Sequence, residues 1–361
     1  MIFGIEAITI KKNLLPPSSL KEAPFGANLK GRFLLNFYEL YQTFRLPFKF
    51  ALRATLREDG DKGVALVVLT AFLLFFQPII ADVDFDISMK TAQYQQVIAS
   101  AQNKDELGLS GTQLMDFFRN LYEKNKPSRC TPSVTIKIPK IIHQIWIGKS
   151  VPEEFNHYQF SWRAHHPDWQ YKLWTQDDIA DLNMHNAELV RESRNPAEIS
   201  DLMRYEILYR YGGVYVDFDF ACLKSLESLH YLYDFYIGIQ PLDSELVQLG
   251  IGLIGSIPGH PLLKSWIERV KETWYNKNVQ GKITARTGPI HCTKVFYDTA
   301  GRGTTCDIAL PASYFYPLGC QEYDIQRGAW LQEGAFAVHY WAKSWLYPAF
   351  RRSEFQNIKN Y

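Results

Sequence analysis

The stretch "ISDLMRYEILYRYGGVYVDFDF", residues 199–220, decides the fold that the sequence predicts. Its first part carries apolar residues at helical spacing and stops at a pair of glycines, as helices commonly do. A short apolar run with β-branched and aromatic residues follows at once and ends in Asp217-Phe218-Asp219. A helix that turns tightly into a buried strand is typical of α/β proteins, so this stretch predicts an α/β fold.

The two carboxylates at the end of this run are candidates for a metal site. If the strand continues through the triplet, Asp217 and Asp219 point to the same face, about 6–7 Å apart along the chain. That spacing suits one hard divalent cation with phosphate oxygens as its further ligands. In open α/β sheets, ligands bind at the carboxyl ends of the strands. The pattern alone leaves a pair of solvent-facing loop aspartates as an equal alternative.

The preceding helix carries Asp201 and Arg204, which are three residues apart and share one face. They could form an ordinary surface ion pair of little energetic value. The glycine turn, however, brings the N-terminal half of the helix towards the acidic end of the strand. There an aspartate and an arginine could hydrogen-bond the hydroxyl groups of a sugar.

Working outward, short apolar runs alternate with helical patterns from 135 to 350, which predicts one α/β domain. The predicted helices cover 197–213 and 260–275. The predicted strands cover 140–148, 169–175, 214–220, 234–240, 246–257 and 335–345.

An uncharged run, "GVALVVLTAFLLFFQPII", stands apart from this domain and is long enough to cross a bilayer. It predicts a transmembrane or signal-anchor helix over 63–81. A buried core helix and a cleaved signal peptide are the alternatives. Basic residues gather before the run and aspartates follow it, which predicts a cytoplasmic N-terminus and a long C-terminal part on the far side of the membrane.

The remaining segments are assigned by composition. Residues 1–62 form a basic and aromatic segment, 82–134 a helical stem and linker, and 351–361 a C-terminal tail. A second Asp-Phe-Asp triplet, at Asp84 to Asp86, falls directly after the apolar run. In that position an acidic cluster is most simply a solvated flank of the membrane segment, so we do not expect a metal site there.

The totals exclude several classes of protein. A 361-residue chain with 47% hydrophobic and 15% aromatic residues can bury a large core. A formal net charge of +1 provides no basic field for nucleic acid, so no nucleic-acid partner is expected. The five cysteines contain no CxxC pair and hence no zinc framework, although one or two disulfides are open to an extracytoplasmic domain.

The stretch 199–220 resembles the signature of the DXD-containing glycosyltransferases of family 32, which include Golgi mannosyl- and galactosyltransferases. It is also similar to the glucosylating domain of large clostridial toxins. The likeness runs in order from about 138 to 345, through "IPKIIHQIWIG", "YKLWTQDDI", "IGSIPGHPLL", "TGP" and "HYWAKSW". One block departs from the pattern, since relatives commonly place an asparagine near the sugar where this chain reads "QLGIGLIGS".

The resemblance implies a GT-A fold, in which a Rossmann-like mixed sheet is flanked by helices. It also implies a nucleotide-diphosphate sugar donor, a Mn²⁺ or Mg²⁺ ion, and transfer with retention at the anomeric carbon. By motif position, Trp146 corresponds to the residue that stacks on the nucleotide base and Tyr215 to the one near the ribose. Asp201 and Arg204 correspond to the pair that grips the donor sugar.

The metal ligands implied by the resemblance are three. Asp219 would bind the ion, Asp217 would bind it through water or hold the ribose, and His339 of the late "HYW" block would complete the coordination shell. Taken singly, a tryptophan, tyrosine or histidine in these places is more commonly a core residue. Their order beside Asp217 and Asp219 favours the functional interpretation.

The sequence thus predicts a metal-dependent retaining glycosyltransferase that moves a hexose to a hydroxyl group of a glycan, lipid or protein. The alternatives are a catalytically inactive nucleotide-sugar-binding protein and a secreted effector that glycosylates host proteins. The expected location is a membrane, of Golgi type in a eukaryote; in a bacterium the protein would be in the inner membrane or secreted.

Overall fold

The computed structural model describes residues 80–99, 108–148, 150–322 and 334–342. These residues fold around a six-stranded mixed sheet. All of them fall in one compact unit, Phe76–Tyr361. The predicted segments 1–62 and 351–361 lie outside the described residues, and so does nearly all of the predicted membrane helix over 63–81. No helix within the described ranges is both long and apolar enough to span a bilayer.

The strands of the main sheet stand in the order β2-β1-β3-β6-β5-β7, and a separate two-stranded sheet pairs β4 with β8. Their bounds are β1 Ile141–Trp146, β2 Gln170–Thr175, β3 Gly213–Val216, β4 Phe220–Cys222, β5 Phe235–Ile239, β6 Leu249–Ser256, β7 Asp307–Leu310 and β8 Ala337–His339.

Strand directions decide which segments meet at one edge of the sheet. Strand β1 is parallel to β2 and β3, β6 is antiparallel to both β3 and β5, and β5 is parallel to β7. Within the main sheet, all strands except β6 therefore run the same way. The segments that follow β3, β5 and β7 consequently leave the sheet at the same edge, which is where ligands bind in open α/β sheets.

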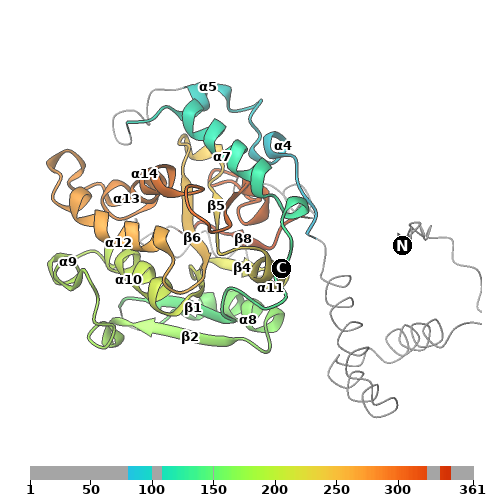
Figure 1. The fold of residues 1–361 in the computed structure, drawn as a ribbon. Coiled ribbons are helices and arrows are strands. Elements are labelled where there is room, and N and C mark those ends of the chain that lie inside the picture. Colours follow the sequence, from blue (N-terminus) through green and yellow to red (C-terminus); the bar gives the residue numbers. More distant parts are fainter. Residues whose placement is uncertain (1–79, 100–107, 149, 323–333, 343–361) are drawn as a thin grey trace, which may run out of the picture. The chain divides into compact units, whose positions relative to one another are not determined.

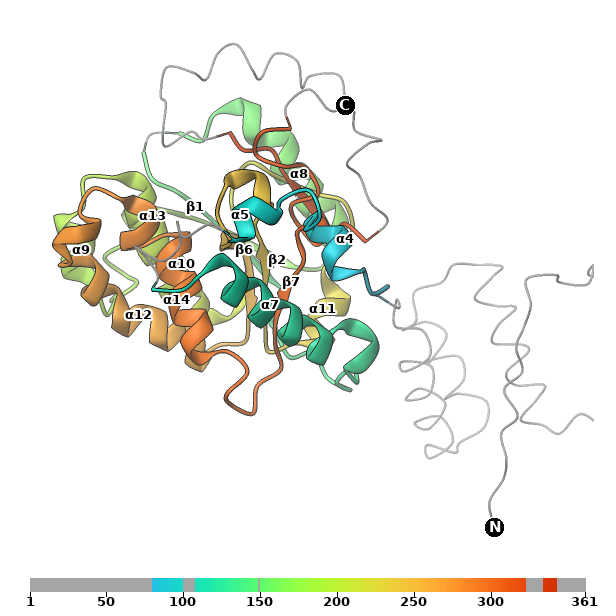
Figure 2. The same ribbon diagram turned by 90° about the horizontal axis from the view of Figure 1, so that it is seen from above.

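Helices cover the sheet, and Figures 1 and 2 show α10, α12, α13 and α14 grouped together while α7 lies against β7. The α-helices are α4 Phe85–Met89, α5 Gln95–Ala99, α7 Gly111–Asn125, α8 Asn156–His165, α9 Ala187–Glu192, α10 Pro196–Tyr211, α11 Glu227–Leu232, α12 Pro261–Trp274, α13 Ile283–Arg286 and α14 Pro289–Thr299.

The connection from α10 to β3 places the acidic triplet. Helix α10 begins where the Asn195 side chain accepts a hydrogen bond from the Ala197 amide, and Pro196 occupies the first turn. It ends at Gly212, which has φ 62°, and a Cβ atom there would come within 2.7 Å of Pro258. Only glycine fits this turn, and the chain enters the fully buried strand β3 at the next residue.

The predicted α/β architecture is confirmed, and the predicted helices at 197–213 and 260–275 correspond to α10 and α12. The predicted strand over 214–220 is too long, because β3 ends at Val216 and the triplet lies in a turn before β4. Of the late strand predicted over 335–345, Ala337–His339 pairs with β4, and residues 343–345 lie outside the described residues.

The helices of 82–134 do not form a stem separate from the α/β domain. Phe85, Met89, Phe118 and Tyr122 are buried in the same hydrophobic core as the strands of the main sheet. Helix α7 begins with a reciprocal capping box between Ser110 and Gln113, and its apolar face packs on β7. These helices are therefore part of the domain whose sheet carries the acidic triplet.

The first Asp-Phe-Asp triplet has a structural role that its sequence did not indicate. Asp84 caps α4 by accepting a hydrogen bond from the Ile87 amide at 2.8 Å. Asp86 pairs with Arg119 of α7 at 2.7 Å, and its hydrogen bond with Arg119 lowers the pKa of this carboxyl below its usual value. The triplet thus joins α4 to α7, and it is not merely a solvated flank.

Candidate active site

Asp217 and Asp219 lie in the turn between β3 and β4, at the carboxyl edge of the main sheet. The backbone fixes the start of this turn, because the Asp217 amide donates to the Gly252 carbonyl at 2.7 Å and the Gln144 side-chain amide donates to the Asp217 carbonyl at 3.3 Å. Strand β4 then pairs Phe220 with His339 of β8. A residue 120 positions away along the chain is thereby brought to the acidic turn.

Asp219 is held from two sides. His339 Nε2 lies 3.0 Å from Asp219 Oδ1, and the Ala342 amide donates to Oδ2 at 2.8 Å. Burial acts to raise the pKa of Asp219, but the histidine and the backbone amide outweigh it, so the pKa is lowered and the carboxylate stays ionised.

These side chains form a geometry that fits a divalent cation. Asp217, Asp219 and His339 each offer one ligand atom, and the three atoms lie within 4.8 Å of one another. The carboxylates are 31% and 14% exposed and the imidazole 12%, so an ion could reach all three from solvent. Carboxylate oxygens and imidazole nitrogen suit Mn²⁺, and the oxygens suit Mg²⁺. The Nδ1 atom of His339 has no partner among the described residues.

Arg204 joins the acidic turn to helix α10. Its Nη2 atom lies 3.1 Å from Asp201 Oδ1, and its Nη1 atom lies 3.5 Å from Asp217 Oδ1. Nη1 also donates to the Ile251 carbonyl of β6 at 2.8 Å. Arg204 and Asp201 are each only 5% exposed, so they are not the ordinary surface pair that the sequence left open. A buried guanidinium beside the acidic turn is positioned to face anionic or hydroxylated ligands.

Thr287, a residue of the "TGP" block, fixes the position of Asp201 in this network. Thr287 donates its hydroxyl to Asp201 Oδ2 at 2.8 Å. Burial raises the pKa of Asp201 to about 6, and the attraction of Arg204 and the bond from Thr287 oppose the shift without cancelling it. This carboxyl therefore changes its charge close to neutral pH, within hydrogen-bond distance of the arginine.

Tyr215 lies within the network rather than at its surface. Its side chain is 1% exposed, and its hydroxyl donates to Asp217 Oδ1 at 2.5 Å. The Arg204 guanidinium lies over its ring at 4.3 Å. In this arrangement Tyr215 orients Asp217, and the contact with a ribose that the resemblance implies for it remains a prediction.

Trp146 ends β1 beside the same turn. Its ring packs edge-on against Phe218, the residue between the two aspartates, with centroids 5.1 Å apart, and it also contacts Phe155. The indole Nε1 has no hydrogen-bond partner among the described residues. The structure thus brings all seven predicted site residues to one edge of the sheet, while their individual roles remain predictions.

The glycines of β6 lie in the block "QLGIGLIGS", which departs from the pattern of the family that the sequence resembles. A Cβ atom on Gly252 would come within 2.7 Å of Asp217 Oδ2 and 2.8 Å of Phe220. On Gly250 it would come within 2.2 Å of the Tyr316 hydroxyl. The strand therefore has no side chains here because the Asp217 carboxylate and the Tyr316 ring occupy that space. Tyr316 itself carried no signal in the sequence.

The fold and this geometry define an α/β protein with a cluster of two carboxylates and an imidazole, of a geometry that fits a divalent cation, at the carboxyl edge of its sheet and next to a buried arginine. Within that class, residues 152–236 match the model of the family described as glycosyltransferase sugar-binding region containing DXD motif. The predicted resemblance to DXD-containing glycosyltransferases is confirmed by this match.

Several curated proteins are similar to this chain. An inositol phosphoceramide mannosyltransferase of Schizosaccharomyces pombe is 31% identical over 43% of this chain and 48% of its own length. An uncharacterized glycosyltransferase of Acanthamoeba polyphaga mimivirus is 29% identical over 58% of this chain and 84% of its own length. The chain thus spans about half the length of the first of these relatives.

Among solved structures, the PaToxG glycosyltransferase is similar to this chain at a TM-score of 0.40 and 16% identity, over 55% of this chain and 80% of that one. A similarity of this size does not establish a shared fold. The resemblance to DXD-containing glycosyltransferases therefore rests on the sequence matches, and the geometry of the site is independent of it.

Proposed function

We propose that this chain is a metal-dependent retaining glycosyltransferase of GT-A type. It would transfer a hexose from a nucleotide-diphosphate sugar to a hydroxyl acceptor. The proposal depends on one observation, that two sets of side chains meet at one edge of the sheet. Asp217, Asp219 and His339 offer a cation site, and Arg204 reaches from Asp201 to Asp217 beside it. The family relationship supports the same activity.

The residues of the site divide the work of binding and orientation. Asp217, Asp219 and His339 would hold a Mn²⁺ or Mg²⁺ ion, which when bound neutralises the charge that develops on a departing diphosphate. Asp201 and Arg204 would hydrogen-bond the donor sugar, and Trp146 would stack on the nucleotide base. Tyr215 holds Asp217 in place through its hydroxyl. Attack by the acceptor hydroxyl from the leaving-group face is our working mechanism.

The donor and acceptor are proposals drawn from the relatives. Curated relatives named inositol phosphoceramide mannosyltransferase make a mannose donor the first to test. Among the glycan, lipid and protein acceptors that the sequence left open, the same names favour a lipid-linked hydroxyl. An acceptor hydroxyl of a glycan, a lipid or a protein would bind at the same site.

The location is proposed from the sequence. We propose that 63–81 anchors the protein in a membrane, with a cytoplasmic N-terminus and the catalytic domain on the far side. The uncharged run and the basic residues before it support this arrangement. Protease protection of the domain in sealed vesicles would test it, since digestion without detergent would contradict it.

Donor hydrolysis by the full chain tests the activity. We would incubate the protein in detergent with Mn²⁺ and GDP-mannose, UDP-glucose, UDP-galactose or UDP-N-acetylglucosamine, beside Asp217→Ala and Asp219→Ala. Release of one nucleoside diphosphate that stops with chelator and in both variants is expected. Binding of a donor without turnover would favour the inactive binding protein instead. Binding of none would mean that the family relationship does not extend to activity.

A further inference from the structure

Tyr316 contacts the cation cluster although it belongs to none of the sequence motifs. It lies in the segment 312–322 after β7, and it is only 2% exposed. Its ring meets the imidazole of His339 edge-to-face, with centroids 5.7 Å apart and planes at 85°. Tyr316 therefore touches one of the three residues that offer a ligand atom to a cation.

Aromatic rings enclose the imidazole of His339. The Phe220 ring stacks on it with centroids 4.5 Å apart, and the Trp341 ring lies tilted against it at 4.2 Å. With Tyr316 as the third ring, only 12% of the histidine side chain is exposed. In close packing of this kind the imidazole cannot turn without displacing a ring. The rings therefore keep Nε2 directed at Asp219 Oδ1, 3.0 Å away.

The sheet is shaped to receive the Tyr316 ring. Gly238 of β5 and Gly250 of β6 are partners across the two strands. A Cβ atom on Gly238 would come within 2.7 Å of the ring, and one on Gly250 would come within 2.2 Å of its hydroxyl oxygen. Glycine weakens a strand, and in these two strands it leaves the space that the ring fills. The position of Tyr316 is thus fixed by the sheet on the side away from solvent.

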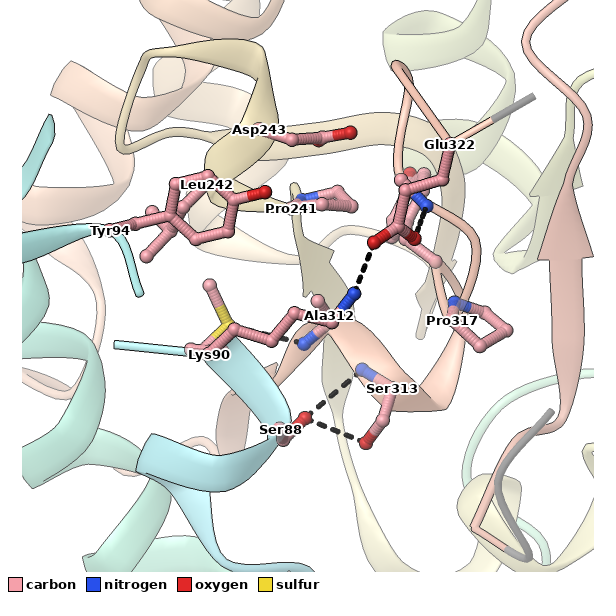
Figure 3. A pocket seen from close by; sticks show the side chains of 13 residues that line it. Ser88, Lys90, Tyr94, Pro241, Leu242, Asp243, Ala312, Ser313, Pro317 and Glu322 are labelled. Atoms are coloured by element: carbon pink, nitrogen blue, oxygen red, sulfur yellow. Dashed lines mark hydrogen bonds and ion pairs between the residues drawn. The ribbon is translucent and has the colours of Figure 1, made fainter. Parts of the chain in front are cut away.

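The segment that carries Tyr316 is also held by the N-terminal helices. Ser313 donates its amide to Ser88 Oγ of α4 at 3.0 Å, and the two hydroxyl oxygens lie 2.6 Å apart. Lys90, directly after α4, pairs with Glu322 at the other end of the segment. Figure 3 shows both contacts around a cavity of about 20 Å³, which has room for about one water molecule. Tyr316 lies between these two attachment points and lines the same cavity.

We propose that Tyr316 is a positioning residue of the cation site and acts through His339. Its ring keeps the imidazole in the orientation that presents Nε2 to a divalent cation beside Asp219. Residues that orient a metal ligand typically change metal affinity by about 10- to 100-fold when they are removed. The part of Tyr316 in glycosyl transfer rests on the proposed function, whereas its effect on cation binding depends on the cluster alone.

Mn²⁺ binding to the full chain in detergent, without a donor, tests this role. The electron paramagnetic resonance signal of free Mn²⁺ gives the dissociation constant. We expect Tyr316→Ala to weaken binding by roughly tenfold, because the imidazole is then free to turn. Tyr316→Phe keeps the ring and should bind Mn²⁺ as the wild type does. Gly250→Ala keeps Tyr316 but displaces its ring, so it should weaken binding as well.

A double-mutant cycle with His339→Ala separates positioning from a general loosening of the fold. If Tyr316 acts through the imidazole, Tyr316→Ala has no further effect on Mn²⁺ affinity in a protein that lacks His339. A general loosening would also weaken the residual binding by Asp217 and Asp219. Thermal melts check that each variant folds, and Tyr316→Leu, which fills more of the space, takes the place of Tyr316→Ala if that variant does not.

Two results overturn the proposal: Mn²⁺ binding by Tyr316→Ala equal to that of the wild type, or an equal loss with and without His339. Donor hydrolysis by the same proteins distinguishes this failure from that of the proposed function. A loss of Mn²⁺ binding in Tyr316→Ala, beside a wild type that hydrolyses no donor, refutes the function and keeps the positioning role. Hydrolysis by a wild type whose Mn²⁺ affinity does not depend on Tyr316 does the reverse. A wild type that binds no Mn²⁺ overturns both.

A separate observation concerns two cysteines far apart in the sequence. The Sγ atoms of Cys130 and Cys306 lie 3.6 Å apart, and both side chains are half-buried. Cys130 follows the short helical turn at Pro127–Arg129, and Cys306 directly precedes β7. A disulfide has an S–S length of about 2.05 Å, so small rotations of the two side chains bring the sulfurs into bonding distance.

We infer that Cys130 and Cys306 form a disulfide when the protein meets a disulfide oxidant such as oxidised glutathione. The Cys130 thiolate attacks the oxidant and releases one glutathione, and Cys306 then displaces the second from the mixed disulfide. Two thiols are oxidised and one disulfide is reduced to two glutathione molecules. Contact with Cys306 lowers the pKa of the Cys130 thiol, which suits it to the first step.

Alkylation of the full chain followed by peptide mass spectrometry tests this pair. After equilibration with oxidised glutathione we expect a Cys130–Cys306 cross-linked peptide that dithiothreitol removes, and a higher midpoint of thermal unfolding that Cys306→Ser abolishes. The buried Cys222 and Cys292 serve as internal controls and stay reduced. Alkylated Cys130 and Cys306 under those conditions would overturn the inference.

Discussion

The chain contains Asp-Phe-Asp twice, and the two copies do different work. At Asp84 to Asp86 the carboxylates cap one helix and pair with the half-buried Arg119 of another. At Asp217 to Asp219 they leave a fully buried strand, face a histidine and contact a buried arginine. The comparison teaches that a carboxylate triplet becomes a candidate metal site through what surrounds it, and three identical letters do not distinguish the two cases.

The largest expected difference between the triplets is in donor turnover. Asp219→Asn keeps the shape of the side chain but removes the charge that a divalent cation needs, so we expect donor hydrolysis to fall by about 1,000-fold. Asp86→Asn is the matched change in the first triplet and should leave hydrolysis unchanged. Initial rates at saturating Mn²⁺ measure both. Equal losses in the two variants would remove the distinction.

The two regions should also respond to pH with opposite signs. Asp201 keeps its proton up to about pH 6 in the folded chain and only up to about 3.8 in the unfolded chain. Between pH 4 and 6 the folded state therefore binds more protons than the unfolded state. The free energy of unfolding consequently falls as the pH rises through this window, by at most about 3 kcal/mol. Asp86, whose pKa is lowered, instead loses stabilisation as the pH falls below about 4.

Denaturant unfolding at several pH values resolves these two contributions. Asp201→Asn should flatten the profile between pH 4 and 6, whereas Asp86→Asn should change it only at lower pH. An unchanged slope between pH 4 and 6 in Asp201→Asn would mean that this carboxyl titrates normally.

A substitution that fills the space beside the second triplet should have a smaller effect on donor hydrolysis. In Gly252→Ala the new Cβ atom would come within 2.7 Å of Asp217 Oδ2, so the carboxylate must move. We expect donor hydrolysis to fall roughly tenfold, because small misplacements of binding groups are costly in enzymes. Gly303→Ala, where the nearest atom lies at 3.9 Å, is the control and should keep full activity. Full activity in Gly252→Ala would show that Asp217 need not be fixed.

The smallest effect is expected at the cap of α4. Asp84→Ala removes the hydrogen bond to the Ile87 amide and should cost about 1 kcal/mol in the free energy of unfolding. Donor hydrolysis should stay at the wild-type rate, because this residue is not a member of the Asp217, Asp219 and His339 cluster. Urea unfolding beside the hydrolysis assay measures both. A loss of hydrolysis would give the first triplet a part in the site after all.

The sequence predicted the connection from α10 to β3 because its signals are local. A glycine pair after an amphipathic run and a β-branched stretch after the glycines each act within a few residues. The seven predicted site residues followed from motif order, and the structure brings them to one edge of the sheet. The strand over 214–220 was overextended, since alternation alone does not reveal that the chain turns at Asp217 to pair with β8.

Residues outside the motifs could not be predicted in the same way. Tyr316 enters the site because β7 carries it to the carboxyl edge, and Gly252 is small because Asp217 occupies the space above it. Both depend on contacts between segments far apart in the chain. For the same reason the sequence predicted a separate stem over 82–134. The apolar faces of its helices do not reveal which surface they pack on.

The sequence by itself determined the α/β class, the glycine turn and the presence of two acidic triplets, because short-range sterics and hydrophobic patterning act on neighbouring residues. Only the tertiary structure decided which triplet faces a histidine. It also decided that Asp201 and Arg204 are buried and that α4 forms one wall of a pocket beside the site. These outcomes depend on strand order and long-range burial, which bring charges together regardless of their separation in the chain.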